Sequence, residues 1–165
     1  MKRIDIVVNS THGNVSLIRE LVKMAVDLSI DLQIHYTQYQ GHGVILAENI
    51  CAQNTSLILA AGGDGTAHEV INGILQSSIN PPPFAIIPVG TGNDFMRGRP
   101  LFTSASQIID SLETKRWKST DLGCINHDQQ KSYFLNIADT GFGGATVHTL
   151  NKQRSWIKGK ISYSL

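Results

Sequence analysis

Residues 57–66 read Leu57-Ile58-Leu59-Ala60-Ala61-Gly62-Gly63-Asp64-Gly65-Thr66, and residues 67–74 continue as Ala67-His68-Glu69-Val70-Ile71-Asn72-Gly73-Ile74. The apolar run at the start has the length of a buried strand and ends at turn residues. The glycines that follow tolerate positive φ angles and let a ligand approach the backbone closely. This segment therefore predicts a short strand, a glycine-rich turn that carries one aspartate, and a helix.

The predicted helix after the turn has one apolar stripe at the spacing of a half-buried helix. The members of the stripe are Ala67, Val70, Ile71, Ile74 and Leu75. Thr66 and Glu69 have the spacing of a capping box, which would make Thr66 the N-cap. Unpaired N–H groups and the positive end of the dipole make a helix start an anion site, and phosphate is the obvious anion. Asp64 would repel a bare phosphate, so the turn also implies a divalent cation or a proton-transfer role.

A second glycine turn has the same organisation. Residues 84–88 form a short apolar run, and they lead into Val89-Gly90-Thr91-Gly92-Asn93-Asp94-Phe95. Again a predicted strand ends in glycines, a hydroxyl group and a carboxylate. In an open α/β sheet, ligands bind at the carboxyl ends of neighbouring parallel strands, so the two turns are expected to face one site.

Strand and helix patterns also occupy the rest of the chain. Residues 3–8 and 32–37 predict strands before the first turn, and residues 117–125 and 131–139 predict strands after the second. Apolar stripes predict three further helices. The first follows an N-cap at Asn14 and has the stripe Leu17, Ile18, Leu21, Val22, Ala25 and Leu28, and the second has the stripe Val44, Ile45, Ala47 and Ile50. The third follows a capping box at Ser104 and Gln107 and has the stripe Ala105, Ile108, Ile109 and Leu112. Alternating strands and helices favour an α/β fold with an open, mostly parallel sheet and flanking helices.

Composition narrows the function classes. Charged residues make up 16% of the chain and hydrophobic residues 41%, with a net charge of +1. The charged fraction is below the ~25% usual for soluble domains, and so small a net charge gives no indication of a nucleic-acid partner. No apolar run is long enough to span a bilayer and no leader is visible, so a cytoplasmic protein is expected.

The last fifteen residues differ from the rest in charge. They contain four basic and two aromatic side chains and no acidic one: Lys152, Arg154, Trp156, Lys158, Lys160 and Tyr163. Such a segment can lie on an anionic membrane surface, which leaves a peripheral membrane location open. The preferred interpretation is an ordinary solvated segment.

The two turns together resemble the catalytic domain of the diacylglycerol and sphingosine kinases, in particular that of soluble bacterial lipid kinases. The likeness rests on Gly62-Gly63-Asp64-Gly65-Thr66 with the following Glu69-Val70-Ile71-Asn72-Gly73, and on Pro88-x-Gly90-Thr91-Gly92-Asn93-Asp94-Phe95. It extends from Asn9 to about residue 163. The resemblance implies a protein about twice this length, so the chain is expected to be the amino-terminal half. Residues 1–120 would form the ATP-binding α/β domain and residues 121–165 the incomplete start of a β-rich lipid-binding domain.

The resemblance also implies residue roles. A Mg-ATP cradle is expected from Asn9, Ser10, Thr11, His12, Gly13, Thr37, Gly62, Gly63, Asp64, Gly65, Thr66, Glu69, Gly90, Thr91 and Asn93. Asp64, Asp94 and Asp121 would hold Mg²⁺, and Asp64 would also assist deprotonation of the lipid hydroxyl. Ser10 stands where the family has a proline, and Gly143 stands where it has an aspartate.

The expected function is ATP-dependent phosphoryl transfer to diacylglycerol or a related lipid at a membrane surface. The alternatives are an NAD kinase, which shares the first turn, and a non-catalytic nucleotide-binding remnant. Because the general base and some metal ligands of the family lie after residue 165, the isolated chain is expected to be inactive toward lipid. It is also expected to be marginally stable or a homo-oligomer.

Overall fold

The computed structural model describes residues 2–9, 16–77, 80–89, 94–97, 102–127, 130–136 and 138. Within these ranges the elements follow along the chain as β1 (Arg3–Asn9), α1 (Ser16–Asp27), β2 (Asp31–Thr37), α2 (His42–Cys51), β3 (Leu57–Gly62), α3 (Asp64–Ser77), β4 (Phe84–Pro88), α4 (Ala105–Thr114), β5 (Gly123–His127) and β6 (Gln130–Phe134).

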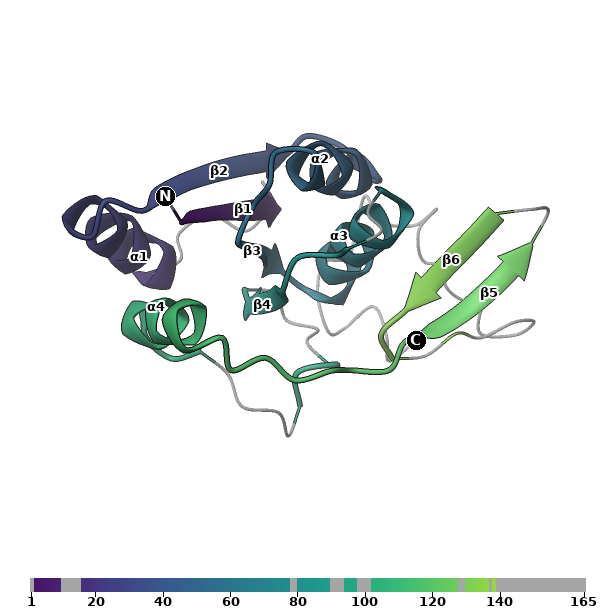
Figure 1. Ribbon diagram of the computed structural model, residues 1–165. Coiled ribbons are helices and arrows are strands. Elements are labelled where there is room, and N and C mark those ends of the chain that lie inside the picture. The colour runs from purple at the N-terminus through teal and green to yellow at the C-terminus, as the bar shows by residue number, and fades with distance from the viewer. Residues whose placement is uncertain are drawn as a thin grey trace, which may run out of the picture.

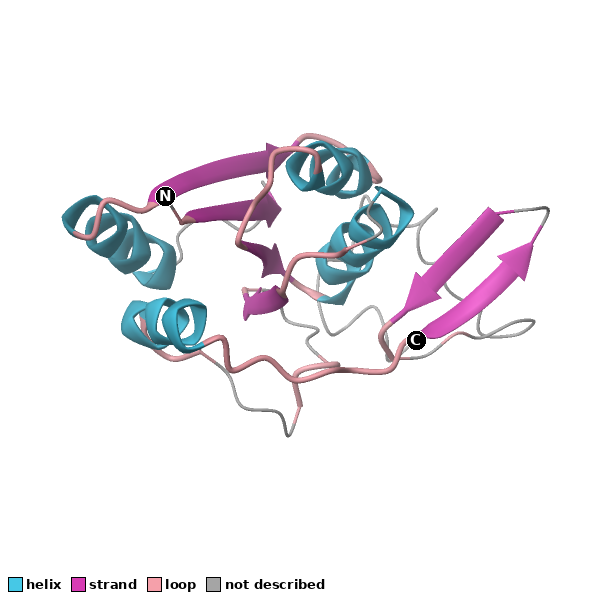
Figure 2. Ribbon diagram, in the orientation of Figure 1, coloured by secondary structure: helices cyan, strands magenta, loops and turns pink. Residues whose placement is uncertain are grey.

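A four-stranded parallel sheet forms the centre of the molecule (Figure 1), with the strand order β2-β1-β3-β4. In the register of this sheet, Val7 lies opposite His35 on β2 and opposite Ala60 on β3. Strands β5 and β6 form a separate antiparallel pair (Figure 2). The expectation of an open, mostly parallel sheet with flanking helices is therefore confirmed.

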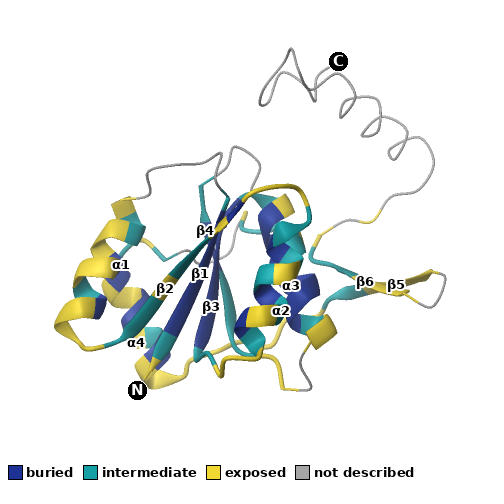
Figure 3. Ribbon diagram, turned by 90° about the horizontal axis from the view of Figure 1, so that it is seen from above, coloured by how far each residue is buried: buried dark blue, intermediate teal, exposed yellow. Residues whose placement is uncertain are grey.

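Helices cover both faces of the parallel sheet, so strands β1 and β3 are buried on both sides (Figure 3). Parallel strands that are buried on both faces have continuous apolar sequences, which explains the uninterrupted apolar run of β3. Helices α1 and α4 pack on one face around Ile4, Ile6, Val8, Leu21, Leu57, Leu59, Ala61, Ile87, Ala105, Ile108, Ile109 and Leu112. Helices α2 and α3 pack on the other around Val7, Ala47, Ile50, Ile58, Ala60, Val70, Ile71 and Ile74.

Helices α2 and α3 approach one another closely at Gly73. A Cβ atom on Gly73 would lie 2.3 Å from the carbonyl oxygen of Val44 and 2.8 Å from Cβ of Ala47. Real Cβ atoms do not come this close to backbone oxygens, so glycine is the residue that permits this packing distance. The apolar stripe predicted for α3 is confirmed, because Ala67, Val70, Ile71 and Ile74 are all buried.

The predictions for the last two strands are wrong at their boundaries. Residues 117–122 have no regular secondary structure, and β5 begins only at Gly123, which pairs with Phe134. Strand β6 ends at Phe134 instead of continuing to residue 139, because the ladder stops where its partner strand begins. An alternating sequence indicates a strand but does not show where its partner ends.

Several residues predicted to be buried are exposed. Ile45 is 45% exposed on α2, Val22 is 38% exposed on α1, and Leu28 is 51% exposed just after α1 ends. Each helix buries a narrower face than its stripe suggests, with Leu21 and Ala25 on α1 and Ala47 and Ile50 on α2. The predicted N-cap Asn14 lies outside the described residues. The N-cap of α4 is confirmed, since the Ser104 hydroxyl accepts a hydrogen bond from the Gln107 N–H at 3.4 Å.

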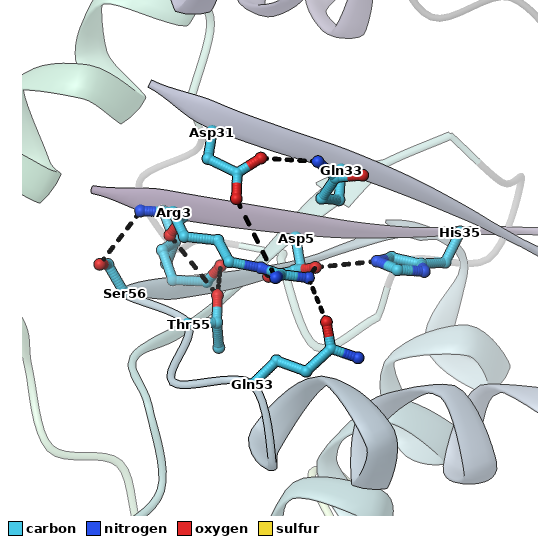
Figure 4. A network of polar contacts seen from close by, with 9 residues as sticks. Arg3, Asp5, Asp31, Gln33, His35, Gln53, Thr55 and Ser56 are labelled. Carbon is cyan, nitrogen blue, oxygen red and sulfur yellow. Dashed lines mark hydrogen bonds and ion pairs between the residues drawn. The ribbon is translucent and has the colours of Figure 1, made fainter. Parts of the chain in front are cut away.

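One fully buried carboxylate lies within the sheet, on the face covered by α2 and α3 (Figure 4). Asp5 accepts hydrogen bonds from Nε and Nη2 of Arg3, each at 2.8 Å, and lies 2.8 Å from Nε2 of His35. Nη2 of Arg3 also donates to Oε1 of Gln53 at 2.6 Å. Although burial opposes ionisation, the hydrogen bonds from Arg3 and His35 hold the pKa of Asp5 well below its usual range. This network ties β1 to β2 and to the segment after α2.

None of the helices in the described ranges is both long enough and apolar enough to cross a bilayer.

Candidate functional site

The candidate site lies where β3 gives way to α3 and β4 gives way to the following turn. Strands β3 and β4 are parallel neighbours, with Gly62 opposite Pro88. Their carboxyl ends therefore lie at the same edge of the sheet, where ligands bind in open α/β folds. The N–H of Val89 donates to the Gly62 carbonyl at 3.1 Å, so the pairing continues up to the glycine turn.

Asp64 joins the two turns. Its Oδ2 accepts a hydrogen bond from the Asp94 N–H at 2.9 Å, and its Oδ1 accepts one from the Phe95 N–H at 3.3 Å. Asp64 is the first residue of α3 and is only half-buried. A single carboxylate thus reaches from the start of α3 to the backbone of the second turn, so the described parts of the two turns lie side by side.

Gly62 and Thr66 form the interior of the first turn. A Cβ atom on Gly62 would lie 2.2 Å from the hydroxyl oxygen of Thr66, so only glycine leaves room for that side chain. The Thr66 hydroxyl is buried, and it accepts a hydrogen bond from Nδ2 of Asn9 at 3.4 Å. Asn9 ends β1. These contacts bring the ends of β1 and β3 together at the start of α3.

The capping box predicted for Thr66 and Glu69 is wrong. Helix α3 begins at Asp64, and the N–H of Ala67 already bonds to the Gly63 carbonyl at 3.1 Å. Thr66 therefore lies inside the first turn of the helix. The flexible glycines before Thr66 allow the helix to begin at Asp64, and the Glu69 side chain bonds to another helix.

Glu69 caps the neighbouring helix instead. Its two carboxylate oxygens accept hydrogen bonds from the N–H groups of Gly41 and Gly43, both at 2.9 Å. Gly41 is the N-cap residue of α2, has a φ angle of 87°, and supplies no side-chain cap of its own. A carboxylate at a helix start is stabilised by the free N–H groups and the helix dipole. The anion site at the start of α2 is therefore filled by Glu69.

The three carboxylates expected at Mg²⁺ lie in different settings. Asp64 contacts the backbone of the second turn, and Asp94 pairs with Nε of Arg97 at 3.2 Å. Asp121 is exposed in the irregular segment before β5. In the described ranges, no three acidic, histidine or cysteine side chains are grouped so that they could hold a metal ion. The described side chains therefore do not form a complete metal site by themselves.

The remaining expected nucleotide residues divide into two groups. Thr37 is buried at the carboxyl end of β2, and Gly63 is half-buried. Gly65 is exposed, and a Cβ atom at this position would meet nothing within 4 Å. Those that lie outside the described residues are Ser10, Thr11, His12, Gly13, Gly90, Thr91 and Asn93.

Sequence reasoning missed the role of Asn72, which is buried on α3 and bonds to the backbone of β6. A signal for it was present, because Asn72 interrupts the buried face of a helix, and buried amides are almost always hydrogen-bonded.

Comparison with known proteins identifies the family of the chain. Residues 3–125 match the family model described as the diacylglycerol kinase catalytic domain. The chain is 35% identical over 98% of its length to a diacylglycerol kinase of Staphylococcus saprophyticus, covering 52% of that protein. It is 32% identical over 98% of its length to a diacylglycerol kinase of Staphylococcus aureus strain bovine RF122, covering 51% of it.

A solved structure is also similar. The crystal structure of a diacylglycerol kinase from Bacillus anthracis str. Sterne aligns with a TM-score of 0.52 and 31% identity, over 68% of this chain and 44% of that one. The chain spans about half the length of the curated relatives it matches. Because the family model matches most of the chain, this protein belongs to the diacylglycerol kinase catalytic domain family.

Proposed function

We propose that this chain forms the nucleotide-binding part of an ATP-dependent lipid kinase. The reaction would transfer the terminal phosphoryl group of ATP to the hydroxyl group of diacylglycerol or a related lipid. One observation carries the proposal: Asp64 joins the two glycine turns, because its carboxylate oxygens accept hydrogen bonds from the N–H groups of Asp94 and Phe95. This contact supports one shared site at the carboxyl ends of β3 and β4.

The phosphates are proposed to lie over the first turn and the start of α3. The first N–H groups of a helix have no acceptor within it, and the helix dipole favours an anion there. Gly65 leaves open space beside the backbone at this point. The start of α2 is a poorer candidate, because Glu69 already occupies its N–H groups.

Asp64 is proposed to orient the second turn and to act on the substrate hydroxyl. Phosphoryl transfer depends mainly on positioning and on neutralisation of charge at the phosphates. The carboxylate keeps the Asp94 and Phe95 backbone beside the helix start, so that both turns could contact one nucleotide. A carboxylate at this point could also accept the proton of the attacking hydroxyl group.

Mg²⁺ is proposed to accompany the nucleotide. This ion usually keeps several waters and takes only one or two carboxylates together with substrate phosphates. The lack of a three-ligand cluster in the described ranges is compatible with that mode. Asp64 and Asp94 are proposed to contribute, with Asp121 as the third expected ligand. When bound, the ion would neutralise charge on the phosphate oxygens.

The NAD kinase alternative is not favoured, because the family model and the curated relatives are those of diacylglycerol kinases. The lipid acceptor is proposed from the names of those relatives. Cytoplasmic location and contact with a membrane surface follow from the same proposal. The chain alone is proposed to bind nucleotide without phosphorylating lipid.

Nucleotide binding tests the proposal. Thermal unfolding of the chain should shift upward with Mg-ATP or Mg-ADP, since a ligand at ten times its Kd stabilises the folded state by about 1.4 kcal/mol. Isothermal titration should give the Kd directly. Absence of any shift at millimolar nucleotide with Mg²⁺ would contradict the assignment.

Gly65→Ala tests where the phosphates bind. A Cβ atom at Gly65 would meet nothing within 4 Å, so the variant should fold as well as the wild type. The new methyl group would nevertheless lie on the turn where the phosphates are proposed to bind. The variant should therefore keep its melting temperature without nucleotide and lose most of the shift with it. An unchanged shift would place the phosphates elsewhere.

A further inference from the structure

The β5–β6 hairpin has little support of its own. Strand β5 is exposed from Cys124 to His127, and the first three residues of β6 are exposed as well (Figure 3). An isolated two-stranded hairpin is at best marginally stable in water. The position of this hairpin therefore depends on its contacts with the rest of the chain, and helix α3 lies beside β6 (Figure 1).

Asn72 on α3 makes the central contact with β6. Its Oδ1 accepts a hydrogen bond from the Tyr133 N–H, and its Nδ2 donates to the Tyr133 carbonyl, both at 2.8 Å. One side-chain amide thus satisfies both backbone groups of a strand residue, as a neighbouring strand would. One helical turn later, Nε2 of Gln76 donates to the Lys131 carbonyl at 3.4 Å.

The chemistry at Asn72 requires an amide. The side chain is only 4% exposed, and Nδ2 also donates to the His68 carbonyl at 2.8 Å. Asn72 therefore uses two donors and one acceptor in a buried position, and it is the only buried side-chain amide in the described part of the chain. An ionised carboxylate there would have no donor for the two carbonyl oxygens, and its repulsion from them would push the Tyr133 backbone away from α3.

Asn72 lies on the same helix as Asp64. Asn72 is eight positions after Asp64, which corresponds to about 12 Å along an α-helix. Since α3 packs closely against α2 at Gly73, a strand bound to Asn72 is held at a set distance from the turn that carries Asp64.

We infer that Asn72 is a positioning residue that fixes strand β6 to helix α3 and so sets the position of the hairpin relative to the Asp64 turn. The consequence for catalysis rests on the proposed function, in which the segment after residue 120 begins the lipid-binding part. Asn72 would then align the lipid acceptor with the bound nucleotide without touching either.

Hydrogen exchange measured by NMR tests the contact itself. The Tyr133 amide should be protected in the wild type, and in Asn72→Asp at neutral pH it should exchange faster by about tenfold or more, while amides of β1 and β3 keep their rates. Asn126→Asp is the matched control, because it makes the same chemical change at an exposed position of the hairpin. This control should leave the Tyr133 rate unchanged.

Two results would overturn the inference. One is fast exchange of the Tyr133 amide in the wild type, which needs no variant and so stands even if Asn72→Asp fails to fold. The other is full protection of that amide in a folded Asn72→Asp protein.

The catalytic consequence has its own measurement in the protein expressed from its complete gene. Asn72→Asp should leave the nucleotide Kd within about twofold and raise the KM for diacylglycerol by at least about threefold. An equal loss of affinity for both substrates, or no loss, would overturn the aligning role. If the wild type binds no nucleotide, the proposed function fails. The hydrogen-exchange result still tests whether Asn72 fixes β6 to α3.

Discussion

Replacing Asp5 by asparagine removes the only carboxylate fully buried in the described part of the sheet. Asparagine keeps one acceptor oxygen, so Arg3 could keep at most one of its two hydrogen bonds of 2.8 Å to this side chain, and neither Arg3 nor His35 would face a negative charge. Breaking a buried ion pair from one side destabilises proteins by about 3–5 kcal/mol. The Arg3 side chain is 21% exposed and keeps its contact with Gln53, so we expect the lower end, about 3 kcal/mol.

Thermal unfolding followed by circular dichroism measures this effect. At this chain length about 3 kcal/mol corresponds to a decrease in Tm of about 6–12 °C. Asp31→Asn is the matched control, because Asp31 is a second carboxylate beside Arg3, at 4.0 Å and on a partly exposed side chain. Its replacement should lower the stability by less than about 1 kcal/mol. A decrease for Asp5→Asn no larger than that of the control would refute the reasoning.

The pH dependence gives a second check on the same residue. The pKa of Asp5 is lowered in the folded state, so its contribution to stability is complete above the unfolded pKa of about 3.9 and is lost as the pH falls below it. The difference in stability between wild type and Asp5→Asn should therefore shrink as the pH is lowered from about 5 to about 2. A constant difference across this range would show that folding does not lower the pKa of Asp5.

Three other substitutions test the packing and the caps. Gly73→Ala should lower the stability by about 1–3 kcal/mol despite the better helix propensity of alanine, because its Cβ would lie 2.3 Å from the Val44 carbonyl oxygen; a gain in the urea midpoint would contradict this. Glu69→Gln keeps one acceptor and places an amide donor against the N–H of Gly41 or Gly43, so a loss of about 1–2 kcal/mol is expected in urea unfolding; unchanged stability would mean that the cap is not formed. Ser104→Ala should cost about 1 kcal/mol through loss of the α4 N-cap, and a neutral result would contradict the assigned cap.

Local patterns were sufficient to predict the parallel sheet and its helices. The apolar run of β3 and the stripe of α3 are dictated by burial on both sides, and both lie where the sequence indicates. The meeting of the two turns was also predictable, because adjacent parallel strands end at one edge of the sheet. In the structure, Asp64 connects the two turns by accepting hydrogen bonds from the N–H groups of Asp94 and Phe95.

Contacts between distant parts of the chain were not predictable in the same way. Glu69 was assigned to its own helix from its spacing to Thr66, whereas its carboxylate reaches the start of α2. The lengths of β5 and β6 are set by their mutual pairing and not by the alternation of either strand. The ion pairs of Asp5 depend on strand register, which places β1 beside β2. Such contacts depend on three-dimensional neighbours that no local window contains.

The most direct test of the account follows labelled phosphate from ATP to its acceptor, using the protein expressed from its complete gene. We predict that, with Mg²⁺, the label passes to diacylglycerol and not to NAD. We also predict that Asp64→Asn lowers the rate by at least about a hundredfold with a loss of stability no larger than that of Glu69→Gln, because a polar group aimed at developing charge has effects on the rate of this size. Transfer of the label to NAD, or a near-normal rate of lipid phosphorylation by Asp64→Asn, would contradict the account.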